Sequence, residues 1–260
     1  MRWIRYHREG RPAFGIVRGE DVEEVAGSPL DSYTPTGKRY PLQSVKLLVP
    51  VVPPTFYAAG LNYVQHIKDQ AASRGEAPKI PEKPDVGYRA VNALIAHGEP
   101  IVIPRDAGPK VQYEAELVVV IGKKAKHLPE ADALSCVLGY TIGNDVSERD
   151  WQAQDRTMWR SKNTDTWKPM GPWIETDVNL DRLKTTVRVN GKTTIEFPTN
   201  HMLFGVARYI GTITRYVTLY PGDVIWMGTE GASPNMKPGD VCEIEISGIG
   251  TLRNPFAAES

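Results

Sequence analysis

Three carboxylates beside strongly apolar segments are the residues of this sequence best suited to chemistry. Glu114 and Glu116 lead into the apolar run 117–121, and Asp145 follows the apolar segment 138–143. If residues 113–122 form a strand, Glu114 and Glu116 point to the same face, with Cα atoms about 6.5 Å apart. Like charges held close in a partly dry place repel, so a proton or a cation must lie between them.

Carboxylate oxygens are the ligands that Mg²⁺, Mn²⁺ and Ca²⁺ prefer. Glu114, Glu116 and Asp145 therefore form a candidate site for a divalent cation. The spacing alone also allows an alternative, in which the Glu-x-Glu pair lies on a solvated strand face and binds no cation.

The elements that must position these acids are mostly strands. Short segments rich in β-branched residues and bounded by Gly, Pro or Asn predict strands at 100–104, 113–122, 138–145, 185–191 and 241–252. Helical patterns are fewer, and they cover 63–74, 128–137, 147–160 and 203–214. Strands and helices do not alternate regularly, which argues against a doubly wound parallel sheet. We expect a mostly β fold with peripheral helices (α+β), closed or folded over as a mixed sheet.

The chain divides near a stiff proline connector at residues 50–54. Short strands and turns before it predict a small β-rich N-terminal domain, residues 1–50, followed by a catalytic domain, residues 51–260. The polar, proline-rich segment 75–85 suits a mobile cover over a site.

Composition narrows the class of partner. The 31 basic and 31 acidic residues cancel, so we expect neither a nucleic-acid binder nor a membrane-surface protein. No apolar run approaches the roughly 20 residues needed to cross a bilayer, and we expect a cytoplasmic protein. Cys136 and Cys242 fit no metal-ligand spacing and are expected to be reduced fillers of the interior. The expected partner is a small molecule.

The order of several motifs resembles the fumarylacetoacetate hydrolase family, including its bacterial acylpyruvases and 2-hydroxyhepta-2,4-diene-1,7-dioate isomerases. The resemblance runs from about residue 49 to 256. It rests on NYVQH at 62–66, YEAELVVVIG at 113–122, GYTIGNDVSERDWQ at 139–152, KNTDTWKPMGPW at 162–173, GDVIWMGT at 222–229 and PGDVCEIEISGIGTLRNPF at 238–256. It implies a mixed β-sandwich or roll for the catalytic domain, after a small β-rich N-terminal domain, and a homodimer.

The resemblance implies that Glu114, Glu116 and Asp145 hold Mg²⁺ or Mn²⁺, which a small 2-oxo acid would chelate through two oxygens. Family hydrolases activate water with a His-x-x-Glu dyad on a helix. Here the matching residues are His66 and the shorter Asp69, whose spacing still allows contact across one helical turn. Lys162 matches a lysine that lies near the metal and the acidic end of the substrate.

Further positions match substrate contacts of the family. They are Gln152, Thr229, Arg89 and Tyr88. Glu230 stands where relatives have a proline. Three more charged residues are expected to form a network behind the site, namely Arg149, Asp150 and Arg156.

Three functions follow from these expectations. The first is a hydrolase that cleaves the carbon-carbon bond of an acylpyruvate, a 2,4-dioxo acid, after His66 takes a proton from water. The second is an enzyme that also stabilises an enolate with the metal but does not use water to attack the substrate. Decarboxylases, isomerases and lyases or dehydratases of small 2-oxo or 2-hydroxy-dienoic acids work in this way. The third, from a different class, is a non-catalytic β domain with a structural cation.

Overall fold

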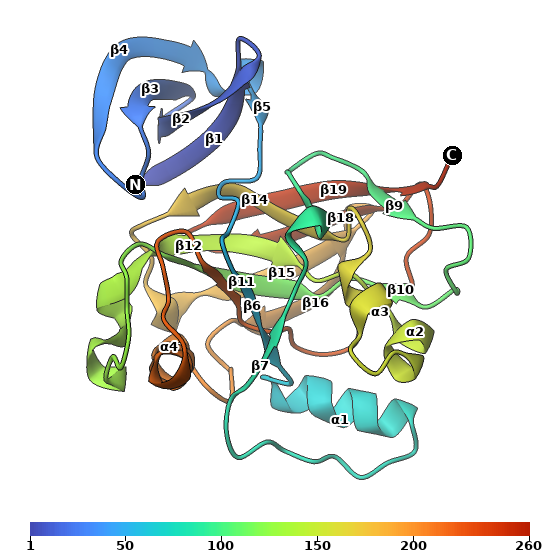
Figure 1. The fold of residues 1–260 in the computed structure, drawn as a ribbon. Helices are drawn as coiled ribbons and strands as arrows, with labels where there is room; N and C mark the ends of the chain where they lie inside the picture. Colours follow the sequence, from blue (N-terminus) through green and yellow to red (C-terminus); the bar gives the residue numbers. More distant parts are fainter.

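The computed structural model describes residues 1–260 and consists mainly of strands with helices around them (Figure 1). Its largest sheet has the order β4-β3-β2-β1-β14-β12-β11-β17-β6-β7, with β5 beside β1 and β8 beside β14. These strands are β1 Arg2–Arg8, β2 Arg11–Arg18, β3 Asp21–Gly27, β4 Tyr33–Pro41, β5 Lys46–Leu47, β6 Phe56–Gly60, β7 Asp85–Tyr88, β8 Leu94–Ile95, β11 Ala115–Ile121, β12 Val137–Asn144, β14 Lys168–Glu175 and β17 Val224–Trp226. The sheet mixes parallel and antiparallel neighbours.

A second sheet of five strands, in the order β16-β15-β18-β19-β9, packs with the first, and β10 pairs with β13 apart from both. The strands are β9 Ile101–Ile103, β10 Val111–Gln112, β13 Ser147–Glu148, β15 Lys184–Val189, β16 Lys192–Pro198, β18 Val241–Ile246 and β19 Gly250–Ala258. The main core includes Leu117 and Val119 of β11 together with Ile244 of β18, whereas Val118 and Val120 belong to a smaller cluster. Because alternate side chains of β11 enter two cores, the strand is buried on both faces and its apolar run does not alternate with polar residues.

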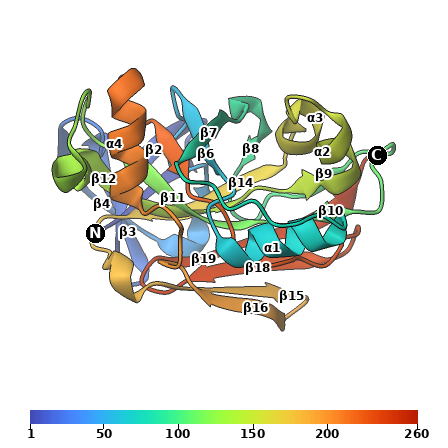
Figure 2. The same ribbon diagram turned by 90° about the horizontal axis from the view of Figure 1, so that it is seen from below.

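The helices lie at the margins of the sheets, as Figures 1 and 2 show. They are α1 Val64–Ser73, α2 Arg149–Gln154, α3 Trp159–Asn163 and α4 Val206–Tyr216, with 3₁₀ turns η1 Leu42–Ser44, η2 Val91–Ala93, η3 Glu130–Cys136 and η4 Leu180–Arg182. The prediction of one helix over 147–160 was wrong, because the chain there begins as β13 and breaks between α2 and α3, where Met158 has a left-handed φ of 54°. The predicted helix over 128–137 is the 3₁₀ turn η3.

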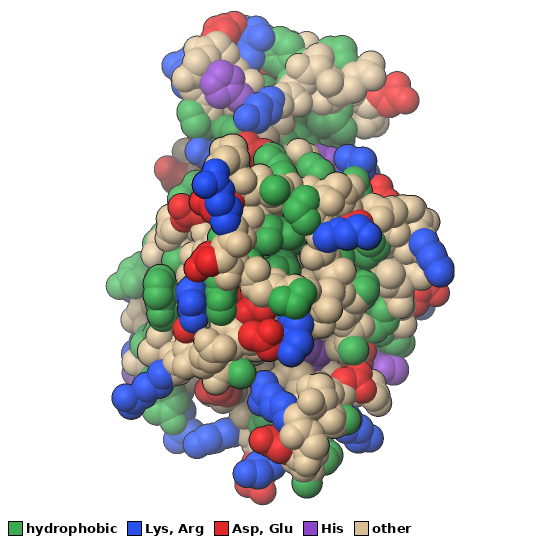
Figure 3. Space-filling view, turned by 90° about the vertical axis from the view of Figure 1, so that its right-hand side faces the viewer, with side chains coloured by type: hydrophobic (Ala, Val, Ile, Leu, Met, Phe, Trp, Pro, Cys, Tyr) green, Lys and Arg blue, Asp and Glu red, His purple; other side chains and the backbone are tan.

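The first four strands form a meander that stands apart from the rest of the molecule in Figures 1 and 3. Ile4, Tyr6 and Val22 form its small core. It joins the large sheet where β1 pairs with β14 at Trp3 and Ile174. On the face drawn in Figure 3, basic and acidic side chains are interspersed, which fits the zero net charge.

The prediction of a mostly β fold with peripheral helices is confirmed. None of the helices is both long and apolar enough to cross a bilayer. Both cysteines are free and buried, as expected for interior fillers.

Candidate active site

The carboxylates of Glu114, Glu116 and Asp145 converge at one end of β11 and β12. The antiparallel register pairs Ala115 with Asn144, so the next residues outward, Glu114 and Asp145, lie side by side. The Asp145 N–H donates to the Glu114 carbonyl at 2.9 Å, which closes this end of the ladder. Oxygen atoms of the three carboxylates lie within 4.8 Å of one another, and all three residues are at most 5% exposed. The register therefore gathers three acids in a place that excludes most water.

Four basic side chains contact two of these carboxylates. The Lys162 ammonium lies 2.7 Å from Glu114 Oε2 and 3.1 Å from Asp145 Oδ2. Lys168 contacts Asp145 Oδ1 at 2.8 Å, and Arg89 contacts Asp145 Oδ2 at 2.9 Å. Arg149 approaches Glu114 Oε1 at 2.6 Å.

These cations lower the pKa values of the two carboxylates that they contact. Burial opposes ionisation of Glu114, but Lys162 and Arg149 outweigh it and lower the pKa of this carboxyl to about 2. Burial likewise opposes ionisation of Asp145, and Arg89, Lys162 and Lys168 together lower its pKa well below the ordinary value. In return, burial lowers the pKa of Lys168 to about 8 in spite of the attraction of Asp145.

Glu116 is the carboxylate of the three without an ion pair. One of its oxygens accepts a hydrogen bond of 2.7 Å from the Gly228 N–H, and the side chain faces the pocket. Burial and the charges of Asp145 and Glu114 raise the pKa of Glu116 well above its ordinary value. A buried carboxylate with no cation of its own, next to two others, is a donor set that fits a hard divalent ion.

His66 lies in the same pocket as the acids, on α1. Its Nδ1 is 2.6 Å from the Gly231 carbonyl, which can only accept, so Nδ1 carries the proton. Its Nε2 faces the Gln70 amide nitrogen at 2.6 Å and accepts from it. Burial lowers the pKa of His66, and Glu114 opposes this only in part, so the ring is neutral near pH 7.

The contact expected between His66 and Asp69 is not formed. Asp69 instead accepts a hydrogen bond of 2.7 Å from Gln65, and it does not line the pocket. Gln70 is four residues after His66, on the same face, whereas the short side chain of Asp69 is turned toward Gln65. Gln70 was not among the predicted residues, although its spacing from His66 was readable in the sequence.

Of the predicted substrate contacts, Gln152, Thr229 and Arg89 line the pocket, which has a volume of about 360 Å³. Tyr88 does not, because neighbouring side chains of a strand point to opposite faces. It is 60% exposed and packs on Tyr57 with ring centroids 5.4 Å apart.

Glu230 supports α1. Its carboxylate accepts hydrogen bonds of 3.2 Å from the backbone N–H groups of His66 and Gly231. Because His66 is in the first turn of α1, this carboxylate satisfies a helix N–H group that would otherwise lack a partner. Glu230 thus helps to fix the position of the histidine.

The predicted charged network behind the site forms only in part. Arg149 contacts Glu114, as a member of such a network would. Asp150 pairs with Lys110 at the surface instead. Arg156 is in the lining of the pocket, not behind it, because the chain breaks between α2 and α3 and exposes the turn. Lys168 was missed, although it stands in the KNTDTWKPMGPW motif.

Two stretches of the chain match the models of known protein families. Residues 55–257 match the family described as "Fumarylacetoacetate (FAA) hydrolase C-terminal", and residues 1–50 match "Rv2993c-like, N-terminal". The chain belongs to the fumarylacetoacetate hydrolase family. It is 37% identical over 253 residues to Protein Rv2993c of Mycobacterium tuberculosis, covering 94% of this chain and 93% of that one.

Two further relatives of this fumarylacetoacetate hydrolase family member carry the names of activities. The mitochondrial oxaloacetate tautomerase fahd2 of Xenopus laevis is 36% identical over 253 residues, covering 92% of this chain and 76% of that protein. The crystal structure of 5-carboxymethyl-2-hydroxymuconate delta-isomerase from Mycobacterium smegmatis superposes with a TM-score of 0.90 at 36% identity, and both chains are covered completely. Members of the superfamily are enzymes, with isomerase, hydrolase and tautomerase activities among them.

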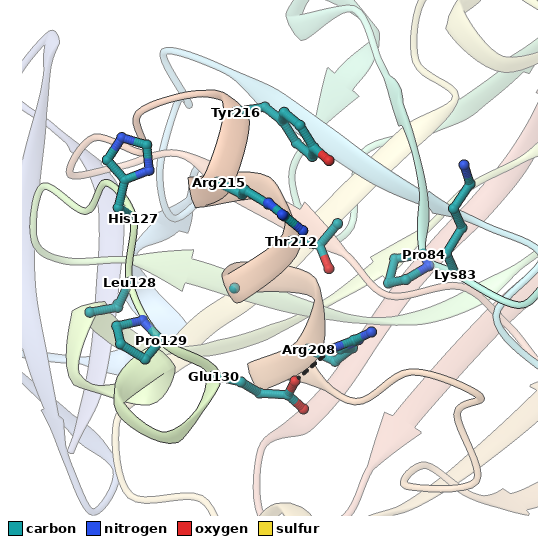
Figure 4. Close-up of a pocket in the computed structure, with 11 residues that line it drawn as sticks. Lys83, Pro84, His127, Leu128, Pro129, Glu130, Arg208, Thr212, Arg215 and Tyr216 are labelled. Atoms are coloured by element: carbon teal, nitrogen blue, oxygen red, sulfur yellow. Dashed lines mark hydrogen bonds and ion pairs between the residues drawn. The ribbon is translucent and has the colours of Figure 1, made fainter.

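Another hollow, of about 680 Å³, lies between α4 and the segment before β7 (Figure 4). It is lined by basic side chains such as Lys83 and Arg215, and its one carboxylate, Glu130, contacts Arg208 at 3.1 Å. It offers no group of acids that could hold a metal ion. The acids that could hold a metal ion instead belong to the group whose members Glu114 and Glu116 line the smaller pocket.

Proposed function

We propose that this protein is a divalent-metal-dependent enzyme that moves a proton between carbon and oxygen, or between two carbons, of a small 2-oxo acid. The observation that carries the proposal is the buried cluster of Glu114, Glu116 and Asp145, in which Glu116 has no ion pair. We assign Mg²⁺ or Mn²⁺ to these three carboxylates. When bound there, the ion would polarise the 2-oxo carbonyl and favour negative charge on its oxygen.

The side chains of this protein supply the proton transfers. His66, neutral and with its proton on Nδ1, presents the lone pair of Nε2 to the pocket. We assign to Nε2 the removal of a proton from C3 of the substrate, whose C–H electron pair becomes the C2–C3 double bond while the carbonyl electrons move to oxygen. Returning the proton to oxygen gives the enol, and returning it to another carbon of a conjugated acid gives an isomer. Gln70 must release Nε2 before the substrate can approach it.

Positively charged groups hold the acid end of the substrate. Lys162 reaches both Glu114 and Asp145 and lines the pocket, so its ammonium is placed to offset the repulsion between the acids and an anionic substrate. Gln152 and Thr229 offer polar side chains in the same lining.

Tautomerisation or isomerisation is favoured over carbon-carbon bond hydrolysis by the surroundings of His66. Activation of water by histidine gains from a carboxylate that stabilises the charged ring. Here the partner of Nε2 is the Gln70 amide, and Asp69 contacts Gln65 instead. The names of relatives that are tautomerases and isomerases support the same choice. Hydrolysis of an acylpyruvate is the second candidate, because it would use the same metal site and histidine.

Exchange of C3 hydrogen for deuterium tests the proposal without assuming the final product. We expect the protein with Mg²⁺ in D₂O to exchange the C3 protons of 2-oxobutyrate, 2-oxoglutarate or acetylpyruvate, followed by ¹H NMR. His66→Ala should lower the rate by a factor of about 100 or more, as expected for loss of a general base. His7→Ala, at an exposed position of β1, is the matched control.

Two results would change the assignment. Exchange that is undiminished in His66→Ala would remove the histidine from the mechanism. Formation of acetate and pyruvate from acetylpyruvate in the same NMR tube would identify the hydrolase instead.

A further inference from the structure

The hollow beside α4 carries positive charge that the protein itself does not neutralise. Three basic side chains and one carboxylate line it, which leaves a net charge of +2 when His127 is neutral. The cations are Lys83, Arg208 and Arg215, and neither Lys83 nor Arg215 makes an ion pair. Arg208 contacts Glu130 at 3.1 Å, but both side chains are about half exposed, and exposed ion pairs contribute little to stability. All three cations are therefore free to contact an anion.

The exposed side of α4 forms the floor of this hollow. Arg208, Thr212 and Arg215 are three or four residues apart, so they follow one side of the helix, while its opposite side packs into the main core. From Arg208 to Arg215 the helix rises about 10.5 Å, so the two arginines stand at different points along the hollow. Figure 4 shows the side chains of Thr212 and Arg215 directed toward the side on which Lys83 lies.

The segment before η3 forms a wall of the hollow and is held to α4 by hydrogen bonds. The His127 N–H donates to the Thr214 carbonyl at 2.8 Å, and the Leu128 N–H donates to Thr214 Oγ1 at 3.2 Å. His127 has a left-handed φ of 54°, a conformation that residues other than glycine keep only where their surroundings hold it. The hollow is therefore preformed by its own backbone contacts.

The size and lining of the hollow suit a ligand larger than a single small anion. Its volume of about 680 Å³ lies in the range of sites for organic ligands. Most of its side chains are charged, polar or aromatic, which suits a polar ligand. Tyr216, at the C-terminal end of α4, lines the hollow and is 72% exposed. A flat base can stack on such a ring, as it does in proteins that bind nucleotides.

We propose that this hollow binds a nucleoside di- or triphosphate, with its phosphates between Lys83 and the arginines of α4 and its base on Tyr216. A chain of phosphates carries several negative charges, so it matches cations spread over about 10 Å better than a single phosphate or carboxylate does. The hollow shares no lining residue with the pocket that contains Glu114 and Glu116. The inference therefore does not depend on the proposed function.

Titration calorimetry with ADP and ATP tests the proposal. The titrations are done in EDTA, because a metal ion at the acidic cluster could itself hold phosphates. Tripolyphosphate has the phosphate chain without the base, and adenosine has the base without the charge, so these two ligands separate the two halves of the proposed contact. Repeating the ATP titration at about 50 and about 300 mM NaCl measures the share of the affinity that depends on charge.

We expect ATP to bind, and Lys83→Ala with Arg215→Ala to weaken its binding by about tenfold or more. Lys79→Ala with Arg182→Ala removes the same charge from exposed positions outside the hollow, and this matched control should change the affinity by no more than about twofold. Tyr216→Ala should weaken ATP by about fivefold or more and leave tripolyphosphate within about twofold, whereas Tyr216→Phe keeps the ring and should behave like the unmodified protein. All the substituted positions are exposed, so the variants should fold.

Four results would contradict the proposal. Absence of binding by ADP, ATP and tripolyphosphate at low salt would overturn it. Binding of ATP that is undiminished in the double variant at positions 83 and 215 would place the nucleotide elsewhere on the protein. Equal affinities for ATP and tripolyphosphate, unaffected by Tyr216→Ala, would remove the base and its ring from the site. Adenosine that binds as tightly as ATP would refute the role of charge. Because C3 exchange enters none of these measurements, the proposed function stands or falls separately.

Discussion

Replacing Glu116 by glutamine should stabilise the metal-free protein and at the same time abolish its stabilisation by metal. Two unit charges 4.8 Å apart, the largest separation within the acidic cluster, repel by about 3.5 kcal/mol at an effective dielectric constant of about 20. Lys162 offsets part of this repulsion, but burial first and then the charges of Asp145 and Glu114 raise the pKa of Glu116 well above its ordinary value. We therefore expect Glu116→Gln to gain about 1 kcal/mol or more without metal, or roughly 3 °C in melting temperature.

The pH dependence has a definite sign. Because the pKa of Glu116 is raised above its ordinary value of 4.5, the native state binds this proton more tightly than the unfolded state does. The stability that the protonated group contributes is fully present below pH 4.5 and is lost as the pH rises through the raised value. Glutamine does not titrate, so the advantage of the variant should grow between pH 4.5 and pH 8.

The assay is thermal unfolding followed by circular dichroism, in EDTA and in Mg²⁺ or Mn²⁺, over this range of pH. Metal should raise the melting temperature of the unmodified protein and should have much less effect on Glu116→Gln. Glu82→Gln, at an exposed position of the segment before β7, is the control for loss of a carboxylate. A variant that is less stable in EDTA would refute the argument from repulsion, and an unchanged metal shift would refute the role of Glu116 as a ligand.

Three other predictions concern Lys168, Asp69 and the two cysteines. Lys168→Met leaves Asp145 with one cation fewer in a buried site and should cost about 3 kcal/mol in metal-free protein, measured by urea unfolding; a loss below about 1 kcal/mol would contradict a structural ion pair. Asp69→Asn should keep C3 exchange within about twofold of the unmodified rate, because Asp69 contacts Gln65 instead of His66. A hundredfold loss of rate would instead indicate that Asp69 acts together with His66. Cys136 and Cys242 should resist alkylation at pH 8 until the protein unfolds, since burial raises the pKa of both thiols; rapid labelling of native protein, followed by mass spectrometry, would contradict the buried positions.

The sequence by itself determined the fold class, the family and the acids that meet in space. Segments rich in β-branched residues and bounded by Gly, Pro and Asn predicted most strands. Such predictions succeed because strand preference and turn formation depend on residues that are neighbours in the sequence. The apolar run after Glu116 marked β11 as a core strand, and the order of motifs identified the family. The sequence alone groups Glu114, Glu116 and Asp145, and one carboxylate oxygen from each lies within 4.8 Å of the other two. Their binding of a metal, the homodimer and the substrate stay predictions.

Tertiary structure decided which side chains surround those acids. Lys168 and Arg89 reach Asp145 from β14 and from the residue just after β7, which are far apart in the chain, so no local pattern reports their contact. Helical spacing alone could not choose between Asp69 and Gln70 as the partner of His66, because residues three and four positions away can both contact it. Because the chain breaks between α2 and α3 instead of continuing as one helix, Arg156 lies in the lining of the pocket. Contacts of this kind depend on register, helix rotation and the path of turns, which packing fixes only when the whole chain has folded.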